Sequence, residues 1–234
     1  MMIEGLTQEL NSQLWLVYAI FLRVGPAISL MPGYGEKSVP PQVKVMLALF
    51  LSSAAAPILE PFLPPEPPLG KELLYFTVRE TTVGFFLGLI SRGALFLLQK
   101  AGAVISQSVS LSQMLGNAVD PMPVISHILT VSGLALFFTT PLSDHAIFAL
   151  LSSFHLDLSS LSNLWGFFAE NVIALISYVT ERGITLSAGF IALFSIYYLF
   201  TGFTNKAMPQ FMITFIGIPF VSLLSIFFYT ITTI

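Results

Sequence analysis

The sequence predicts an all-α, polytopic hydrophobic helical protein whose helices lie in or against a membrane. Hydrophobic residues make up 55% of its 234 residues and charged residues only 9%, whereas a soluble domain carries about a quarter charged residues. The mean hydropathy is +0.86. Alternation of apolar and polar residues over blocks of about ten, which is typical of a membrane β-barrel, is absent. Helices are then the way to satisfy the backbone in hydrocarbon.

Several apolar runs approach the length of about 20 residues that a helix needs to cross a bilayer. We expect the following runs to be the helices of the fold: Leu14–Met31, Val43–Ile58, Leu73–Leu98, Val124–Thr140, Trp165–Thr180, Ile184–Phe203 and Phe211–Ile234. The first run does not resemble a cleaved signal peptide, because Glu4 and Glu9 stand where such a peptide carries positive charge. Several loops carry charges of both signs, so the positive-inside rule does not fix the orientation.

Two stretches between the first three runs contain residues that end helices. Pro32–Lys44, PGYGEKSVPPQVK, combines prolines and glycines with charge and predicts a turn. Pro57–Glu72 contains so many prolines that we expect it to be extended or looped.

The residue content argues against several classes of function. A net charge of -3 does not suit a nucleic-acid partner, which would require a basic face. Without cysteine there is no disulfide, thiolate nucleophile or cysteine-based metal site. His145 and His155 lie near Asp144 and Asp157, but the two histidines are ten residues apart and do not share a helical turn. No HExxH, GxSxG or P-loop motif occurs, so we expect no enzyme, metal or cofactor.

Ionisable residues interrupt the apolar runs, where an unpaired charge is costly and normally faces protein or water. These candidates for buried charge are Arg23, Arg79, Glu80, Arg92, Glu181 and Arg182. One interpretation is a buried ion pair, such as Arg23 with Glu80, that holds two helices in register. The alternative is a proton or ion path, which would cluster several acids, whereas the acids here are scattered.

Glu80 is followed by Gly84 and Gly88 at i+4 and i+8, near one face of a helix. Two glycines in this arrangement form a flat strip on which another helix backbone can approach closely. The spacing predicts tight helix packing and does not by itself indicate a function.

The segment Gly102–Pro121, GAVISQSVSLSQMLGNAVDP, is unusually polar for this chain and is expected to form a short helix or loop that ends near Asn117. Its candidate functional side chains are Ser106, Gln107, Ser108, Ser110, Ser112, Gln113, Met114 and Asn117. Positions 106, 110, 113 and 117 would form one stripe of a helix. Such a stripe can bond neighbouring helices together, or it can line a constriction in an aqueous path. The spacing leaves both interpretations open.

Several segments together resemble the FliR/SctT family, a subunit of the type III secretion export gate. RVGPAISLMPGYGEKSVPPQVKVMLAL is similar to the family's Arg-x-Gly, Pro-x-Gly turn and Val-Pro before a basic residue. The glutamate and glycine helix, the segment ending in Asp-Pro, SDHAIFALLSSF and NKAMPQFMITFIGIP are similar to later parts of the family pattern, in the same order. The matching positions are Arg23, Gly25, Pro32, Gly33, Val39, Pro40, Lys44, Glu80, Gly84, Gly88, Gly102, Asp120, Pro121, Pro209, Gln210, Gly217 and Pro219.

The resemblance implies a non-enzymatic pore subunit in the bacterial inner membrane, at the flagellar basal body. Its partners would be FliP-like and FliQ-like small hydrophobic subunits and an FlhB-like subunit, and unfolded export substrates would pass through the pore. Residues 1–160 would form a FliP-like part and residues 161–234 a FliQ-like helical hairpin, in which Trp165–Phe203 would be one long bent helix. Pro209–Gln210 followed by Gly217-x-Pro219 favours the flagellar branch over the virulence injectisome.

The resemblance also implies a plug loop in the closed pore, formed by residues around Ser106 to Asn117. Small polar side chains suit such a plug, since they pack without strong apolar adhesion and hydrate readily when they are displaced. A different class of function is an independent solute transporter or channel. A transporter would show broken helices in two related halves, and related halves are not visible.

Overall fold

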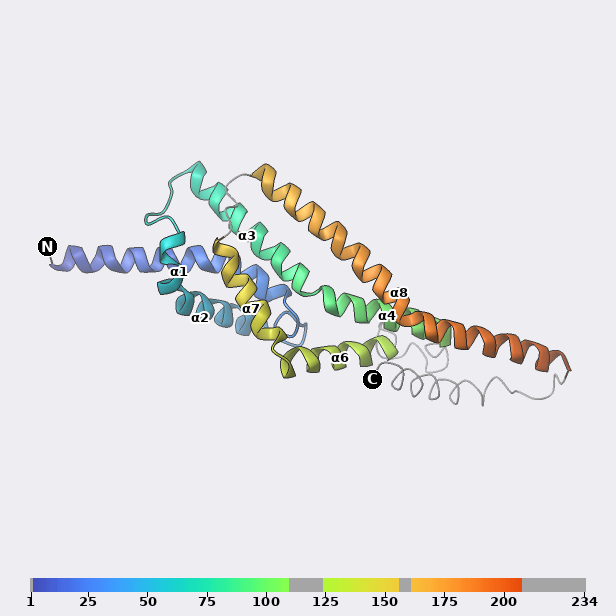
Figure 1. The fold of residues 1–234 in the computed structure, drawn as a ribbon. Helices are drawn as coiled ribbons and strands as arrows, with labels where there is room; N and C mark the ends of the chain where they lie inside the picture. The colour runs from blue at the N-terminus through green and yellow to red at the C-terminus, as the bar shows by residue number, and fades with distance from the viewer. Residues whose placement is uncertain (1, 110–123, 156–160, 208–234) are drawn as a thin grey trace. The chain divides into compact units, whose positions relative to one another are not determined.

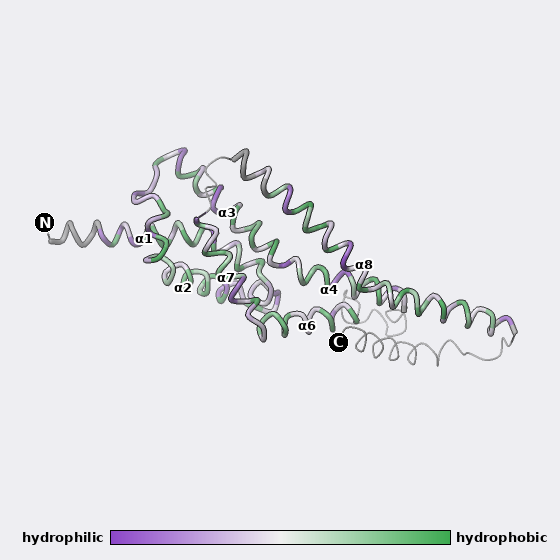
Figure 2. The backbone as a smooth tube through the Cα atoms, viewed as in Figure 1, coloured by the Kyte–Doolittle hydropathy of each residue, from purple (hydrophilic) through white to green (hydrophobic). Residues whose placement is uncertain are grey.

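The computed structural model describes residues 2–109, 124–155 and 161–207, and this part of the chain is helical as predicted (Figure 1). Its elements are α1 (Met2–Leu30), α2 (Pro41–Leu59), η1 (Glu60–Phe62), α3 (Lys71–Ser91), α4 (Gly93–Val109), α6 (Val124–Thr139), α7 (Leu142–Ser152), η2 (Ser153–His155) and α8 (Leu161–Ala207). Apolar residues extend along most of these helices (Figure 2). Four of the described helices are long and apolar enough to cross a membrane, or five spans if α6 and α7 count as one bent span.

The third predicted run, Leu73–Leu98, is wrong as a single helix. α3 ends at Ser91 and α4 begins at Gly93, with Arg92 between them. Nη1 of Arg92 donates to the carbonyl of Leu30 at 3.2 Å. Gly93 is buried, and a Cβ at this position would overlap the side chain of Leu175. Both residues at the junction are therefore in contact with other parts of the first unit.

α8 is a single helix of 47 residues, so the prediction of two helices at Trp165–Thr180 and Ile184–Phe203 is wrong and the alternative of one long helix is confirmed. The helix continues through Glu181, Arg182 and Gly183. Each of these residues has a backbone N–H that can donate to the helix, and one glycine costs only about 1 kcal/mol of helix stability. The predicted run Phe211–Ile234 lies outside the described residues.

α6 confirms the fourth predicted run, whereas α7 was not predicted as a separate helix. The two helices meet at Thr140 and Pro141, where the chain bends by 71°. Pro141 precedes the first residue of α7 with φ of -70°, a value that suits the start of a helix. The chain therefore leaves one helix at Thr139 and begins the next at Leu142.

The predicted turn at Pro32–Lys44 is confirmed up to Pro40, after which α2 begins with Pro41 in its first position. Gly33 in this turn has φ of +79°, and a Cβ there would overlap the ring of Phe138. The prediction for Pro57–Glu72 is only partly right. α2 continues through Pro57 to Leu59, and the irregular segment runs from Leu63 to Gly70.

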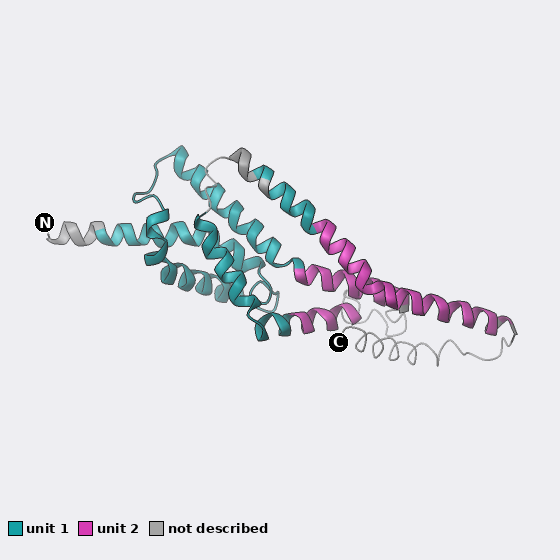
Figure 3. Ribbon diagram, viewed as in Figure 1, with its two compact units in different colours: residues 1–93, 134–175 teal, residues 94–133, 176–234 magenta. Residues whose placement is uncertain are grey.

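The chain divides into two compact units, residues 1–93 with 134–175 and residues 94–133 with 176–234 (Figure 3). This division follows contacts within the chain. The predicted boundary at residue 161 concerns likeness to partner subunits and stays a prediction.

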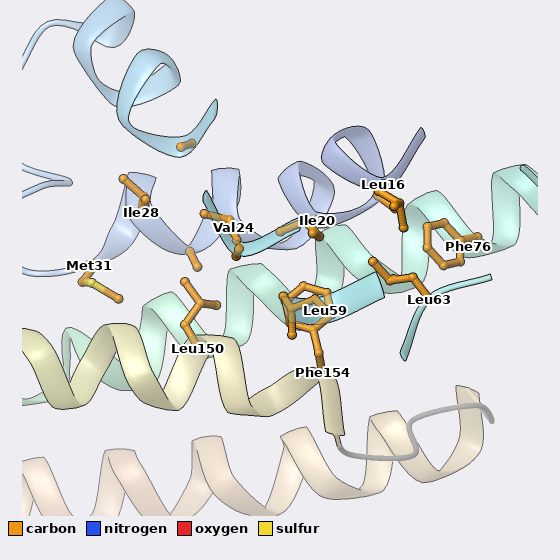
Figure 4. Close-up of a cluster of buried hydrophobic side chains, with 14 of the residues drawn as sticks. Leu16, Ile20, Val24, Ile28, Met31, Leu59, Leu63, Phe76, Leu150 and Phe154 are labelled. Carbon is orange, nitrogen blue, oxygen red and sulfur yellow. The ribbon is translucent and has the colours of Figure 1, made fainter. Parts of the chain in front are cut away.

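The core of the first unit is built on one face of α1, which packs against α2 and α3. Leu16, Ile20, Val24 and Ile28 recur at intervals of four residues and are all buried. Side chains from the other elements complete the cluster (Figure 4): Leu59, Leu63, Phe76, Leu150 and Phe154. A charge on this face of α1 would have to be paired inside the core.

The second unit has a smaller core between α4, α6 and α8. Ile105 of α4 packs with Phe190 and Phe194 of α8, and Ile125 and Leu129 of α6 contact the same cluster.

Candidate functional site

The first unit contains a buried ion pair between α1 and α3. Nε of Arg23 lies 2.6 Å from Oε2 of Glu80, and the two residues are 4% and 1% exposed. Because Arg23 is enclosed within the core of this unit, its charge cannot reach water. This contact is the ion pair between two helices that the sequence suggested as one interpretation of the buried charges.

Arg23 also joins α1 to the end of α7. Its Nη1 donates to Oγ of Ser153 at 3.0 Å, and that hydroxyl donates in turn to the carbonyl of Leu150 at 2.6 Å. The guanidinium carbon lies 4.0 Å from the ring centre of Phe154, in a cation–π contact. A single arginine therefore connects three elements of this unit.

A second guanidinium uses the other oxygen of the same carboxylate. Nε and Nη2 of Arg79 lie 3.1 Å and 2.9 Å from Oε1 of Glu80. The Arg79 side chain is 22% exposed, whereas that of Glu80 is 1% exposed. The cluster of Arg23, Arg79 and Glu80 thus has two positive charges and one negative charge.

The two glycines after Glu80 allow the helices to come this close. A Cβ at Gly84 would overlap the carbonyl oxygen of Arg23, and one at Gly88 would lie 2.7 Å from the carbonyl oxygen of Ala27. Distances under about 3.0 Å are shorter than van der Waals contact, so α1 lies directly on the glycine strip. The predicted close packing at this spacing is present.

Arg92 forms a second ion pair in the first unit. Its Nη2 lies 3.1 Å from Oε1 of Glu36, and both side chains are about one-fifth exposed, at 19% and 23%. Because Glu36 lies in the turn after α1, this pair and the Leu30 carbonyl fix the end of α3 against that turn.

These contacts favour a structural role for the charges over a proton path. Arginine stays protonated in proteins and cannot relay a proton. Glu80 already accepts bonds from two guanidiniums, and no other described carboxylate pairs with Arg23 or Arg79. The cluster can hold α1, α3 and η2 in register.

In the second unit, α4 and α6 approach closely at Gly102. A Cβ at Gly102 would overlap the backbone of Ser126, and Oγ of Ser126 donates to the carbonyl of Gln99 at 3.0 Å. Gly102 therefore has a packing role at the start of the predicted polar segment.

The beginning of that polar segment is the last turn of α4. Ser106 is 1% exposed, Gln107 is exposed and Ser108 is partly buried. Oγ of Ser108 donates to the carbonyl of Val104 at 2.9 Å. Oγ of Ser106 is buried and has no hydrogen-bond partner in the described structure. Of the four positions in the predicted stripe, only Ser106 lies in the described residues, and it is buried.

Replacing Ser106 with alanine is expected to leave the thermal stability of the protein unchanged or to raise it. A buried hydroxyl without a partner costs about 1–3 kcal/mol of desolvation, which the alanine removes. The measurement is the melting temperature of the purified protein, with Ser126→Ala as the control that removes a hydroxyl bonded across two helices. A lower melting temperature for Ser106→Ala than for Ser126→Ala would mean that Ser106 has a polar partner.

Glu181 and Arg182 are exposed in the chain by itself, and their burial within an assembly stays a prediction. The adjacent Gly183 faces Lys100 of α4, with a virtual Cβ 3.1 Å from Cγ of that lysine. Residues 181 and 182, which are exposed, lie outside the contact between Gly183 and Lys100. Arg182 lies over the ring of Tyr178, 5.7 Å from its centre, on α8 itself.

The remaining predicted positions divide into two groups. In the described part, Gly25 lies within α1 beside the ring of Phe21, Pro32 is buried in the turn and Pro40 precedes α2. Outside it lie Ser110, Ser112, Gln113, Met114, Asn117, Asp120, Pro121, Pro209, Gln210, Gly217 and Pro219.

Sequence reasoning missed the polar and aromatic partners of the predicted charges. Ser153 and Phe154 belong to the segment SDHAIFALLSSF, whose likeness to the family pattern did not indicate a contact with Arg23. Glu36 stands in a loop whose mixed charge gave no sign that it pairs with Arg92. His155 packs against Phe62, with ring centres 4.1 Å apart. Within the described residues, no group of three or more acids and histidines is arranged to hold a metal.

The comparisons with known proteins agree along nearly the whole chain. A profile of the family described as bacterial export proteins, family 1, matches residues 14–234. The flagellar biosynthetic protein FliR of Escherichia coli K12 is 30% identical over 229 residues, which cover 93% of this chain and 84% of that protein. The protein of the same name from Caulobacter vibrioides is 24% identical over 212 residues, which cover 88% of this chain and 84% of that protein.

The family match includes both the buried charge cluster and the end of α4 that the sequence motifs singled out. Family membership also accords with a non-enzymatic protein with membrane-spanning helices. The chain belongs to family 1 of the bacterial export proteins, which is the FliR/SctT family.

Proposed function

We propose that this chain is a pore subunit of the flagellar type III protein export gate in the bacterial inner membrane. It helps to form the channel for unfolded export substrates and to close it. Its partners are FliP-like and FliQ-like small hydrophobic subunits, with an FlhB-like subunit beside them. The flagellar assignment rests on the relatives, both of which are named flagellar biosynthetic proteins.

The observation that carries the proposal is the surface of α8. Large apolar side chains are exposed along it, including Ile176, Ile196 and Phe200 at 60%, 61% and 75%. Glu181 and Arg182 are exposed between them, within the 37-residue apolar segment Phe168–Thr204. Lipid would cover the apolar side chains but not the charges. A protein partner can cover both, which supports a subunit of an assembly over an independent transporter.

The division of the chain follows from the same proposal. Residues 1–160 form the FliP-like part, and residues 161–234 form the FliQ-like hairpin. The start of α8 at Leu161 and its continuity to Ala207 support a first hairpin arm of this length.

The proposed plug is the polar segment within residues 102–121. Its described part is the end of α4, where Gln107 is exposed and Ser108 is partly buried. The plug candidates are Ser106, Gln107, Ser108, Ser110, Ser112, Gln113, Met114 and Asn117.

Deleting Val109–Met114 is expected to leave the complex assembled and to make the membrane leaky to small solutes. The deletion removes side chains that close the channel but none of the described contacts of the first unit. The measurement is solute flux into cells or proteoliposomes, normalised to the amount of intact complex.

A second variant separates the loss of the plug from the loss of chain length. It replaces residues 109–114 with six alternating glycines and serines and is also expected to leak. If both variants assemble and neither leaks more than the unmodified protein, the segment is not the plug.

A further inference from the structure

The buried charge cluster of Arg23, Arg79 and Glu80 has one positive charge in excess. Glu80 uses both carboxylate oxygens, Oε2 for Arg23 at 2.6 Å and Oε1 for Arg79 at 2.9 Å. The described structure contains no further ion pair to either arginine. Arg23 is enclosed by the core and by Ser153 and Phe154. Of the two arginines, Arg79 is the more exposed, so the excess charge of the cluster lies closest to the surface there.

Arg79 stands at the edge of an exposed apolar face of α3. Leu74, Val78 and Phe85 on this helix are 67%, 53% and 48% exposed. The side chain of Arg79 keeps 22% of its surface exposed beside them, although two of its nitrogens bond Glu80. We call Leu74, Val78, Arg79 and Phe85 the α3 outer face.

The position of Arg79 along α3 limits what can cover this face. Arg79 lies eight residues after Lys71 and twelve before Ser91, or about 12 Å and 18 Å from the two helix ends. The hydrocarbon core of a bilayer is about 30 Å thick. Because Glu80 holds the guanidinium, it cannot extend along the helix towards a lipid headgroup. Hydrocarbon alone would leave the net positive charge of the cluster without a counter-ion, which is costly.

We propose that the α3 outer face is a subunit contact, and that an aspartate or glutamate of a partner subunit neutralises Arg79. The proposal rests on the proposed function, since it requires an assembly. A carboxylate from a partner would make the cluster electrically neutral, with two arginines and two acids. The apolar side chains around it would exclude water and strengthen the pair.

The test uses a single cysteine at Val78, next to Arg79, because the chain contains no native cysteine. The cysteine is labelled with a maleimide–benzophenone in the assembled complex in native membranes and is then irradiated. We expect a covalent adduct with a second polypeptide, whose cross-linked peptide contains or adjoins an aspartate or glutamate. In the Arg79→Gln background, the adduct is expected to fall about tenfold for equal amounts of chain.

Two further variants keep the result interpretable. Arg92→Gln is the matched control, since Arg92 is similarly exposed but has its counter-ion Glu36 in this chain; its adduct yield should not change. Arg79→Lys keeps the charge and should retain most of the adduct. Exchanging charge at both partners, with Arg79→Glu and lysine at the identified acid, should restore the yield lost in Arg79→Glu alone.

Adducts formed only with lipid, or an unchanged yield in Arg79→Gln, would overturn the proposed contact. If the complex still contains its small hydrophobic subunits, the proposed function survives this failure. A chain that purifies without any partner would instead contradict the proposed function.

Discussion

Cells that carry Glu80→Ala are expected to lose nearly all of this protein from the membrane and, with it, flagellar export. Glu80 is 1% exposed and is bonded by Arg23 and Arg79, so its removal leaves two positive charges without a counter-ion. Breaking a buried pair by removing one partner costs about 3–5 kcal/mol. That loss is a large part of the total stability of a typical domain, which is about 5–15 kcal/mol. The measurement is the amount of full-length chain in membranes, together with motility.

Glu36→Ala is the matched control for this prediction. Its partner Arg92 is partly exposed, and the carboxylate itself is 23% exposed, so water replaces much of the lost interaction and the expected cost is about 1 kcal/mol or less. If Glu80→Ala and Glu36→Ala accumulate to the same level as the unmodified protein, the buried cluster does not stabilise the fold.

Gly84→Ala is expected to have the second largest effect. The added methyl group would overlap the carbonyl oxygen of Arg23, which is backbone and cannot rotate away. The helices must separate, which lengthens the bond between Arg23 and Glu80 in addition to the usual cost of about 1–3 kcal/mol for overpacking. The measurement is the melting temperature of the purified complex, which should fall clearly.

Gly189→Ala controls for the effect of alanine within a helix. Nothing lies within 4 Å of a Cβ built at Gly189, and the residue is exposed on α8. Alanine there should stabilise the helix by up to about 1 kcal/mol. A melting temperature for Gly84→Ala equal to or above that of Gly189→Ala would contradict the close contact of α1 with α3.

The helical class and most helix positions could be predicted because apolar run length is a local property of the sequence. The break at Arg92 could not, since the contacts made there, to the Leu30 carbonyl 62 positions away and to Leu175 beside Gly93, are not local in the sequence. The continuity of α8 could not be predicted from the sequence for a similar reason. Glu181 and Arg182 look like an interruption until the helix is seen to bury Gly183 and expose its two neighbours.

Part of the candidate site was predictable because Glu80, Gly84 and Gly88 lie on one helix face, and because few acids within the apolar runs are available to pair with Arg23. Ser153 and Phe154 were not, because nothing in the spacing indicates that the chain bends by 71° before α7 and brings them beside Arg23. The excess charge at Arg79 also becomes visible only when both oxygens of Glu80 are seen to be occupied.

The most direct test of the proposed assembly is the intact mass of the complex purified through this chain in mild detergent, after co-expression with its genomic neighbours. We predict a large complex that contains one copy of this chain and several copies of two small hydrophobic proteins. A lone monomer, or an oligomer of this chain alone, would contradict the export-gate function and favour an independent transporter or channel.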